Sequence, residues 1–345
     1  MNKNIDISFI IPCLNGKQFI YRCLDSLLGL KSNNWEAVIV DNGSDDGSYE
    51  LLLSYAKRDR RFIVLKSNKK CQSTAKNIAV KNASGKYVCF VDIDDAVSCD
   101  LLDAYPIDKN FDFYFSNWKK IRKNKESSVV LPMKNEFLGR DHIIKIQKWI
   151  FGDVQSRNPL SIDAFSSNCG KLYKTSIILE NNILFTPMEI IGGSEDAIFN
   201  MEYLNFAMNG YFSNKELYHY YSHNNSYTHN RSLEKLFLYF SQYHIMQNII
   251  KKFELDNIYD TLLKNRLIIV SLPVFIVASR LNIKRKEKFD FYKKYLSYTE
   301  FDEASKLFSA KKFGVVYKFL YHFLIKKHYK LLYYMLRVTD AFYNH

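Results

Sequence analysis

Residues 87–95 read YVCFVDIDD, five apolar residues followed by three carboxylates within four positions. The apolar run is typical of a strand that is buried on both faces. Three similar runs precede it, at residues 7–11 (ISFII, ended by Pro12), 37–40 (AVIV) and 62–65 (FIVL). The chain therefore begins with four short apolar strands, and the last of them ends in a cluster of acids.

The segments between these strands have the apolar spacing of helices. Apolar residues recur at three- and four-residue steps over residues 17–28, and similar patterns occupy 48–55, with Ser48 as a cap, and 73–83. Strands alternating with helices predict an α/β fold with a mostly parallel sheet flanked by helices. Such sheets bind ligands at the carboxyl ends of their strands. We therefore expect the polar clusters at 12–15, 41–45 and 92–95 to meet at one edge.

The acidic cluster suggests a cation site. Asp92, Asp94 and Asp95 would repel one another unless a cation shared them, and Mg²⁺ or Mn²⁺ binds carboxylate oxygens together with diphosphate. The alternative is a solvated turn that caps the next helix. Asp41 follows the second strand directly, and its carboxylate can accept hydrogen bonds from a base or a ribose. The clusters together predict a nucleotide pocket.

Four motifs, in order and spacing, resemble family 2 glycosyltransferases, which have the Rossmann-like GT-A fold. The motifs are residues 9–12 (FIIP) with Asn15, 38–48 (VIVDNGSDDGS), 73–77 (STAKN) leading to 83–87 (ASGKY), and 90–95 (FVDIDD). The resemblance is strong over residues 5–100, looser over 165–225 and absent after 230. It implies an inverting, metal-dependent hexosyltransferase that uses a nucleotide-sugar.

The resemblance also implies roles for single residues. Asp41 would hold the donor base, in a pocket shaped by Pro12 and Asn15, and Asp92 would contact the ribose. Asp94 would bind the Mn²⁺ or Mg²⁺ that bridges the phosphates, with Asp95 in support. Lys76 stands where the family more often has Arg, and a lysine lacks the planar guanidinium fork that would contact the nucleotide. Lys76 is either a contact of the donor or a solvated lysine on a helix.

Three further candidates come from the looser part of the resemblance. Asp196, in the stretch 192–199 (GGSEDAIF), would be the base that deprotonates the acceptor hydroxyl; the alternative is that Glu195 and Asp196 favour a helix N-terminus. Lys171 would help to hold the diphosphate or has a structural role. His223 would reach the metal or the phosphate, unless it is an exposed loop residue; Ser222 before it replaces an expected Arg.

Charge and composition divide the chain. Residues 226–345 carry 21 Lys and Arg against 10 Asp and Glu, which accounts for +11 of the net charge of +13. We place a boundary near residue 228: a GT-A catalytic domain over 1–228, with a donor half at about 1–100 and an acceptor half at about 101–228, and a helical basic domain over 229–345. Residues 119–128 are expected to form a charged loop.

The basic C-terminal region has two interpretations. Residues 311–337 contain seven basic residues and no acid, and Lys318, His322, Lys326 and Lys330 form one row of a single amphipathic helix. Such a helix suits an anionic membrane surface, or it packs on the catalytic domain while its lysines are solvated. Phe313, Val316, Leu320, Leu324, Leu331 and Met335 are expected on the opposite side.

The sequence also bears on cellular location. The six cysteines form no metal-binding spacing, and residues 1–6 lack the apolar core of a signal peptide. The apolar run at 267–279 is about 13 residues long, shorter than the ~20 that a membrane span needs. These features favour a cytoplasmic protein; a peripheral position on the inner face of the membrane stays open.

The function expected is transfer of one sugar, most simply from a UDP-sugar, to a hydroxyl of a glycan or lipid-linked acceptor in bacterial-type surface polysaccharide or lipooligosaccharide synthesis. A sugar nucleotidyltransferase would need a Gly-rich, Arg-containing loop where residues 12–16 read PCLNG. A non-catalytic carbohydrate- or membrane-binding relative would lack the acidic residues. No motif for nucleic acid accompanies the positive charge, and a processive synthase would show a QxxRW motif.

Overall fold

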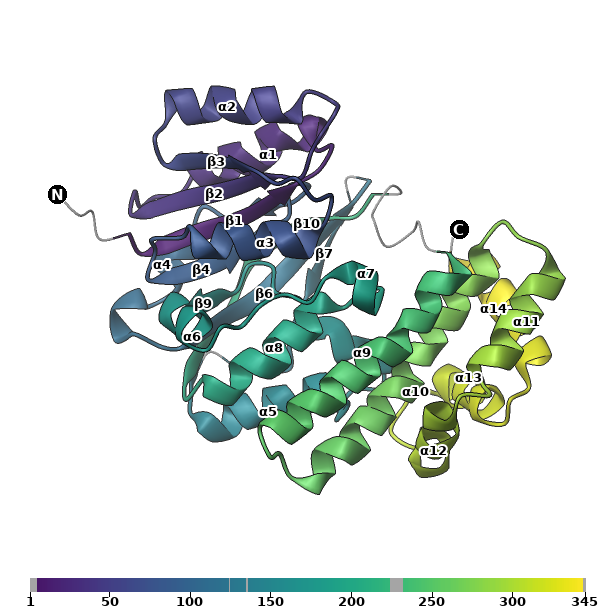
Figure 1. Ribbon diagram of the computed structural model, residues 1–345. Helices are drawn as coiled ribbons and strands as arrows, with labels where there is room; N and C mark the ends of the chain where they lie inside the picture. The colour runs from purple at the N-terminus through teal and green to yellow at the C-terminus, as the bar shows by residue number, and fades with distance from the viewer. Residues whose placement is uncertain (1–4, 124, 135, 224–231, 344–345) are drawn as a thin grey trace. The chain divides into compact units, whose positions relative to one another are not determined.

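The computed structural model describes residues 5–123, 125–134, 136–223 and 232–343 (Figure 1). The chain divides into two compact units, each discontinuous in sequence. The first unit comprises residues 1–144, 167–188 and 202–224, and the second comprises 145–166, 189–201 and 225–345. The boundary predicted near residue 228 lies outside the described residues.

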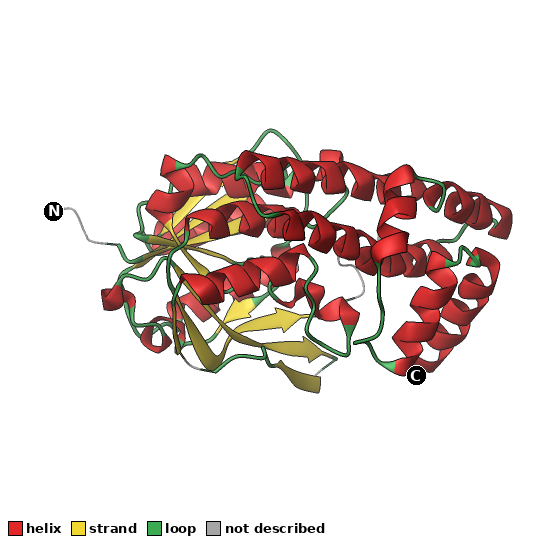
Figure 2. Cartoon of the chain, turned by 90° about the horizontal axis from the view of Figure 1, so that it is seen from below, coloured by secondary structure: helices red, strands yellow, loops and turns green. Residues whose placement is uncertain are grey.

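The first unit contains a ten-stranded sheet in the order β3-β2-β1-β4-β9-β6-β10-β5, with β7 paired to β6 and β8 to β10. Figure 2 shows its strands fanning out, as the right-handed twist of strands requires. The strands are β1 (Ile7–Cys13), β2 (Trp35–Asp41), β3 (Phe62–Lys66), β4 (Tyr87–Phe90), β5 (Ala96–Val97), β6 (Phe113–Arg122), β7 (Lys125–Val129), β8 (Glu136–Leu138), β9 (Leu172–Lys174) and β10 (Gly210–Tyr221).

The four N-terminal strands are parallel, as the sequence predicts, and β1 lies between β2 and β4. Three helices join them: α1 (Lys17–Leu28), α2 (Ser48–Arg58) and α3 (Gln72–Lys81). α1 buries Ile20, Cys23, Leu24 and Leu27, which are the residues that its apolar spacing selects. The α/β fold is therefore confirmed: the N-terminal half of the sheet is parallel, as predicted, while the sheet as a whole is mixed. This arrangement brings the carboxyl ends of β1, β2 and β4 to one edge.

Two local predictions in this unit were wrong. Ser48 is not an N-cap: Gly47 (φ +85°) precedes the helix, and the Ser48 hydroxyl instead accepts a hydrogen bond from the Gly16 N–H at 3.0 Å. Residues 119–128 are not a loop, because β6 and β7 form an antiparallel pair there, with Lys119 opposite Ser128. Charged residues conceal this hairpin in the sequence, since strand patterns are sought in apolar alternation.

Further helices lie in the middle of the chain. They are α4 (Leu101–Ala104), α5 (Arg140–Phe151), α6 (Thr175–Glu180), α7 (Met188–Ile191) and α8 (Glu195–Phe206), with 3₁₀ turns at Ile107–Lys109 and Pro159–Ala164. The sequence between β4 and α8 alternates less regularly than the first 95 residues. Its strands β6 and β10 pair in parallel, and β9 is antiparallel to both β4 and β6.

The described residues beyond 231 are helical, as predicted. The helices are α9 (Leu233–Lys252), α10 (Asn257–Arg280), α11 (Arg285–Tyr295), α12 (Thr299–Leu307), α13 (Val315–Ile325) and α14 (Tyr329–Tyr343). Stacked aromatic rings pack them: Phe275 lies on Tyr292 with centroids 4.2 Å apart, and Phe240 lies on Tyr298 at 4.0 Å. The high aromatic content therefore forms much of this unit's core.

The apolar run at 267–279 belongs to a longer helix than the sequence suggested. α10 has 24 residues, continues through Pro273, and is the one helix in the described part of the chain that has the length and composition to cross a membrane. Of its most apolar window, 67% is buried within the structure. The helix is therefore longer than the apolar run of about 13 residues from which a span was judged too short. Because the buried core helix of a soluble protein has the same length and composition, α10 by itself does not indicate a membrane span.

The C-terminal region also differs from the prediction of one helix. α13 ends at Ile325, and Lys327 adopts a positive φ of 58° before α14 begins at Tyr329. The row from Lys318 to Lys330 therefore does not lie on one helix. Phe313, Leu320 and Leu324 are buried, whereas Val316 and Leu331 are exposed. Part of the expected apolar side thus packs inside the unit and part does not.

Candidate active site

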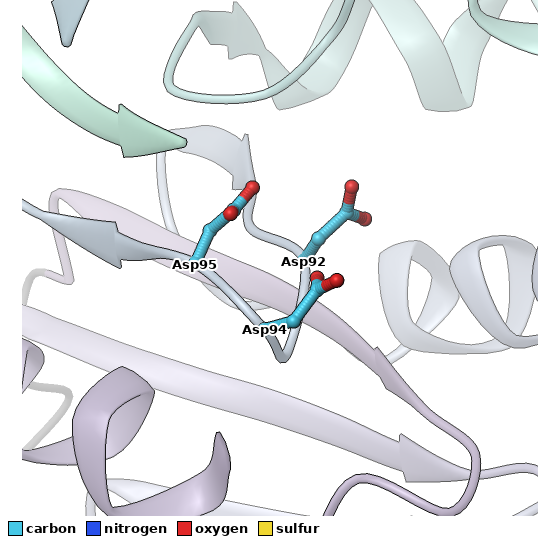
Figure 3. A group of neighbouring side chains, drawn as sticks. All are labelled: Asp92, Asp94 and Asp95. Carbon is cyan, nitrogen blue, oxygen red and sulfur yellow. The ribbon is translucent and has the colours of Figure 1, made fainter. Parts of the chain in front are cut away.

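An acidic turn follows β4, at the carboxyl edge of the sheet. One ligand oxygen each from Asp92, Asp94 and Asp95 can be chosen so that all lie within 4.8 Å of one another (Figure 3). Asp95 is buried, while Asp92 and Asp94 are half-buried. This arrangement has a local reason. Because β4 is buried, the turn that follows it is held at the edge of the sheet, and the three acids lie in that turn.

Asp95 is held from both sides by β10. Its Oδ2 accepts a hydrogen bond from the Tyr218 hydroxyl at 2.6 Å, and its Oδ1 accepts one from the Tyr221 N–H at 2.8 Å. Burial first, and then the charges of Asp92 and Asp94, raise the pKa of Asp95 well above its usual range. A nearby cation would offset that repulsion, so the trio is a suitable site for one.

Asp94 lies against His223, and these are two of the residues that the resemblance assigns to the metal. His223 Nε2 is 2.5 Å from Asp94 Oδ2, and its ring stacks on Phe19 with centroids 5.0 Å apart. The guanidinium of Arg22 donates to the backbone oxygen of Asp94 and lies 3.8 Å from the Tyr221 ring centroid. His223 is therefore half-buried in the acidic site, and the alternative of an exposed loop residue does not hold.

Asp92 is surrounded by polar groups from other segments. Its Oδ1 accepts a hydrogen bond from the Gln72 amide at 3.2 Å, and the thiol of Cys169 lies 3.5 Å from its Oδ2. The Asp92 N–H donates to the Tyr218 hydroxyl at 3.2 Å. Tyr218 thus contacts both ends of the acidic turn and fixes the relative position of Asp92 and Asp95.

Asp41 ends β2 and forms a turn of its own. Its Oδ2 accepts hydrogen bonds from the N–H groups of Gly43 at 3.0 Å and Ser44 at 3.2 Å. Its Oδ1 is buried and has no hydrogen-bond partner among the described residues. A buried carboxylate oxygen without a donor is costly. The geometry leaves this oxygen available to an N–H or O–H group of a ligand.

The loop after β1 joins these two clusters. Asn42 N–H donates to the Cys13 carbonyl at 2.7 Å, and Val91 N–H donates to the Ile10 carbonyl at 3.0 Å, so both ligand-bearing turns attach to β1. Asn15, at a φ of 50°, accepts from the Asp45 N–H through its side chain and donates from its backbone to Ser44. β2 and β4 flank β1 at about 5 Å on each side.

Pro12 and the two predicted donor-binding lysines occupy buried positions. Pro12 is within β1 and pairs with Val40, so the strand continues past the point where the sequence suggested that it ends. Lys76 on α3 is 2% exposed, with its ammonium 4.8 Å from the Phe185 ring centroid. Lys171, just before β9, is 4% exposed. Neither lysine is solvated, which removes the solvated alternative for Lys76.

Asp196 belongs to the second unit, at the second position of α8. Gly192, Gly193 and Ser194 all have positive φ values before this helix, at 71°, 153° and 57°. A Cβ on Gly192 would lie 2.7 Å from the Lys235 carbonyl of α9, so glycine is required there. Glu195 and Asp196 therefore do lie in the first turn of a helix, as the alternative of helix N-terminal support assumes, and Asp196 is half-buried there.

Several contacts in the site were not predicted from sequence. Tyr218, Arg22 and Gln72 hold the acidic turn, and Phe19 supports His223. Phe19 and Arg22 lie three residues apart on α1, a spacing that places them on one helix face. For these contacts the sequence offered only that spacing, which does not show which segment of the chain packs against this face of α1.

The donor set around Asp94 fits a hard divalent cation. Carboxylate oxygens are the ligands that Mg²⁺ and Mn²⁺ prefer, and imidazole also serves Mn²⁺ and other transition ions. Asp92, Asp94 and Asp95 would supply the oxygens, and His223, whose Nε2 contacts Asp94, would supply a nitrogen. Asp95 already accepts two hydrogen bonds, so Asp94 is the better placed direct ligand.

Sequence comparison identifies the N-terminal part of the chain. The family model for Glycosyl transferase family 2 matches residues 8–105. A poly(ribitol-phosphate) beta-glucosyltransferase of Bacillus spizizenii is 29% identical over 201 residues, covering 56% of this chain and 29% of that protein. Glycosyltransferase GlyA of Streptococcus pneumoniae is 26% identical over 221 residues, covering 62% and 30%. The match thus spans less than a third of either relative.

Structural comparison covers nearly the whole chain. Residues 1–349 of Staphylococcus aureus TarS, solved in complex with UDP-GlcNAc, give a TM-score of 0.65 at 18% identity, covering 97% of this chain and 92% of that one. At this identity the likeness concerns the fold, which is the GT-A fold followed by helices. Together these matches show that residues 8–105 fit the model of glycosyltransferase family 2 and that the chain has the GT-A fold followed by helices.

Proposed function

We propose that this protein is a divalent-cation-dependent glycosyltransferase that moves one sugar from a UDP-sugar to a hydroxyl of a surface glycan or lipid-linked acceptor. The observation that carries the proposal is the pairing of two features at the ends of the strands that flank β1. Among the described residues Asp41, at the end of β2, has a buried oxygen without a hydrogen-bond partner, and the acidic turn after β4 offers a cation site on the other side of β1. A nucleotide diphosphate needs both, a donor pocket for its base and a cation for its phosphates.

The residues would divide the work as follows. Asp41 Oδ1 would accept a hydrogen bond from the base, in a pocket formed with Pro12 and Asn15, and Asp92 would contact the ribose. Asp94, with Asp95 and His223, would hold Mn²⁺ or Mg²⁺, which supplies charge stabilisation for the departing diphosphate when bound. Lys76 and Lys171 are two buried cations in the same unit that would add to that stabilisation.

Asp196 is proposed as the general base. It would take the proton of the acceptor hydroxyl while that oxygen attacks the anomeric carbon and the bond to the diphosphate breaks. A single displacement of this kind inverts the anomeric configuration. The support for it is the position of Asp196 in a motif that resembles the family's, at the start of α8.

The relatives favour surface glycopolymer synthesis. One is named a poly(ribitol-phosphate) beta-glucosyltransferase, and TarS has been solved with UDP and with UDP-GlcNAc. These names support a UDP-sugar as the donor and a bacterial surface polymer as the acceptor. A cytoplasmic position, where nucleotide sugars are made, is part of the same proposal.

A donor panel tests the proposal. Incubation with several UDP-, GDP- and dTDP-sugars and Mn²⁺ should release nucleotide from a UDP-sugar. Removing the cation with a chelator should lower that release at least a thousandfold, since a bound cation contributes several kcal/mol to leaving-group stabilisation. Added Mn²⁺ or Mg²⁺ should restore it. Release that survives in chelator contradicts the metal role, and pyrophosphate formation from UTP and a sugar 1-phosphate would indicate a nucleotidyltransferase instead.

We further propose that the C-terminal helices contact an anionic membrane surface. On α13, Val315, Val316 and Phe319 are 62%, 56% and 56% exposed and lie beside exposed Lys318. On α14, Leu331 and Tyr334 are 49% and 48% exposed, next to Lys330. Exposed apolar side chains interleaved with lysines suit the interface between lipid headgroups and chains.

Vesicle co-sedimentation tests this contact. The protein should bind vesicles rich in phosphatidylglycerol at low salt, and binding should weaken at high salt because the lysines are screened. Replacing Val316 and Phe319 by Ser and Lys318 by Gln should reduce binding at least tenfold, since each buried apolar side chain contributes about 1.5–3 kcal/mol. A Leu307→Ser, Lys293→Gln variant is the control. Equal binding by both variants would remove the proposal.

A further inference from the structure

The segment that precedes α8 has an unusual backbone conformation. Gly192, Gly193 and Ser194 have consecutive positive φ values of 71°, 153° and 57°. Glycine adopts such values readily, but for Ser194 the left-handed conformation costs free energy and persists only where neighbouring groups hold it. Asp196 follows two residues later, in the first turn of the helix. The position of Asp196 therefore depends on what holds residues 192–194.

One face of α9 holds this segment. The Gln242 amide donates to the Gly193 carbonyl at 2.6 Å, although 49 positions of sequence separate the two residues. A Cβ on Gly192 would lie 2.7 Å from the Lys235 carbonyl and 3.0 Å from the Leu238 Cβ, so this backbone lies directly on the helix. Lys235, Leu238 and Gln242 are spaced by three and four residues, which places them on the same side of α9. All of these residues belong to the second unit.

The amide of Gln242 lies among apolar and aromatic neighbours on its helix. Its side chain is 2% exposed. The other residues that α9 buries are Leu236, Tyr239, Phe240, Tyr243, Met246 and Ile249. Leucine or methionine would serve packing equally well, because burying an amide costs free energy unless its hydrogen bonds are made. The presence of an amide here is therefore explained by its bond to the Gly193 carbonyl.

The part of α8 that follows Asp196 is anchored by two further amides of the second unit. The Asn200 amide is fully buried and donates to the Ser166 carbonyl at 2.7 Å. The Gln147 amide of α5 donates to the Met201 carbonyl at 3.3 Å. Because these bonds fix the helix beyond its first turn, we expect loss of the bond before the helix to displace mainly the first turn, which carries Asp196.

We propose that Gln242 is a positioning residue for Asp196: its hydrogen bond fixes residues 192–194 on α9 and thereby sets where the Asp196 carboxylate lies. The C-terminal helices then take part in the transfer reaction through α9. A general base acts only within hydrogen-bond reach of its proton, and a displacement of about 1 Å can lower a rate about a hundredfold. This inference rests on the proposed function, because it assumes that Asp196 is the general base.

The test removes the Gln242 amide and compares the loss of a similar bond elsewhere in the same unit. Q242M keeps the length of the side chain but removes its donor. Y292F is the control, because the buried Tyr292 hydroxyl of α11 donates to the Phe275 carbonyl of α10 at 2.9 Å. Both changes are also combined with D196N, and the full chain is used throughout. Should Q242M not fold, Q242N, whose amide is one methylene shorter, replaces it.

Hydrogen exchange measures whether Gln242 holds the segment. In Q242M the backbone amides of residues 192–197 should exchange at least about tenfold faster than in the parent, because the first turn of α8 opens more often. Exchange in α11 should stay as in the parent. In Y292F, residues 192–197 should exchange as in the parent. Unchanged exchange at 192–197 in Q242M, or faster exchange throughout the second unit, would overturn the inference.

Steady-state kinetics measures whether the held position matters for transfer. With UDP-GlcNAc as donor and poly(ribitol phosphate) as acceptor, Q242M should lower kcat about ten- to a hundredfold. KM for the donor and release of UDP to water should stay within about twofold of the parent, since the proposed donor site lies in the first unit. Y292F should transfer at the parent rate. Added to D196N, Q242M should cause less than about a twofold further loss, because residues that act through one group are not additive.

The outcomes separate this inference from the proposed function. No transfer by the parent, or parent-like transfer by D196N, would count against the proposed function, and hydrogen exchange would still decide whether Gln242 holds the segment. Loss of transfer in D196N together with parent-like transfer in Q242M, an equal loss in Q242M and Y292F, or a full additional loss in Q242M/D196N would overturn the role of Gln242 alone. Faster exchange confined to residues 192–197, with a loss in kcat that disappears in the D196N background, would establish it.

Discussion

Replacing Asp94 by Asn is expected to lower the rate of sugar transfer by about a thousandfold. The substitution keeps the size of the side chain but removes the charge at the centre of the acidic turn, beside His223. If Asp94 is the direct ligand, cation affinity falls, and stabilisation of the leaving diphosphate, worth roughly 4 kcal/mol, is lost with it. The measurement is the initial rate of UDP release and transfer at the Mn²⁺ concentration that just saturates the parent.

An Asp103→Asn variant controls for the loss of an exposed carboxylate in the same unit, where Asp103 lies at the surface near Lys31. It should transfer at the parent rate. Calorimetric titration with Mn²⁺ in the presence of UDP should show binding for the parent and the Asp103 variant, and much weaker binding for Asp94→Asn. Full activity of Asp94→Asn, or unchanged Mn²⁺ affinity, would exclude Asp94 as the main ligand.

An Asp196→Asn variant should lose between about a hundredfold and ten-thousandfold in kcat, the usual contribution of a general base. Its affinity for UDP and its release of UDP to water should change far less, because the first unit holds the proposed donor site. Asn still accepts a hydrogen bond at the start of α8, so the helix should persist. Steady-state transfer to a surface-glycan acceptor is the measurement.

The competing explanation for Asp196 is electrostatic support of the helix N-terminus, which makes a different prediction. That effect is worth about 0.3–1 kcal/mol of unfolding free energy and would lower the melting temperature without a large change in kcat. A Glu189→Gln variant, which removes a carboxylate from the first turn of α7, gives a matched stability control. If Asp196→Asn lowers the melting temperature but transfers sugar at the parent rate, Asp196 supports the helix and is not the general base.

The first hundred residues could be read from the sequence because their local and global preferences agree. The apolar runs of β1, β2 and β4 belong to strands that are buried throughout, and the spacing of Ile20, Cys23, Leu24 and Leu27 matches the buried face of α1. Polar clusters directly after those runs could therefore be placed at one edge. Asp41 and the acidic turn were found in this way.

The partners of the site residues could not be read in the same manner. Tyr218 is more than 120 residues from the acidic turn, and Tyr221 and His223 approach it only because β10 and β5 are neighbours in the sheet. The order of strands after β4 depends on which apolar surfaces fit together, and it leaves no periodic signal in the chain. The β6–β7 hairpin was mistaken for a loop for a related reason: its exposed strands have no apolar alternation.

The C-terminal region illustrates the same division. A helical period carried through residues 311–337 predicts one continuous helix, yet the chain turns at Lys327, where a positive φ separates α13 from α14. Leu320, Tyr321 and Leu324 of α13 are buried in the second unit, and most of the stability of a helix in a protein comes from such packing rather than from propensity. Propensity describes single segments, and packing decides where they end.

By itself the sequence determined the alternation of strands and helices, the parallel direction of the first four strands and the acids that follow the fourth, since these depend on local periodicity and on chain direction. Only the tertiary structure decided that Asp94 meets His223, that Tyr218 spans Asp92 and Asp95, that Lys76 is buried and that Gln242 contacts the Gly193 carbonyl. These contacts join residues distant in the chain, and their energies depend on packing that no single segment encodes.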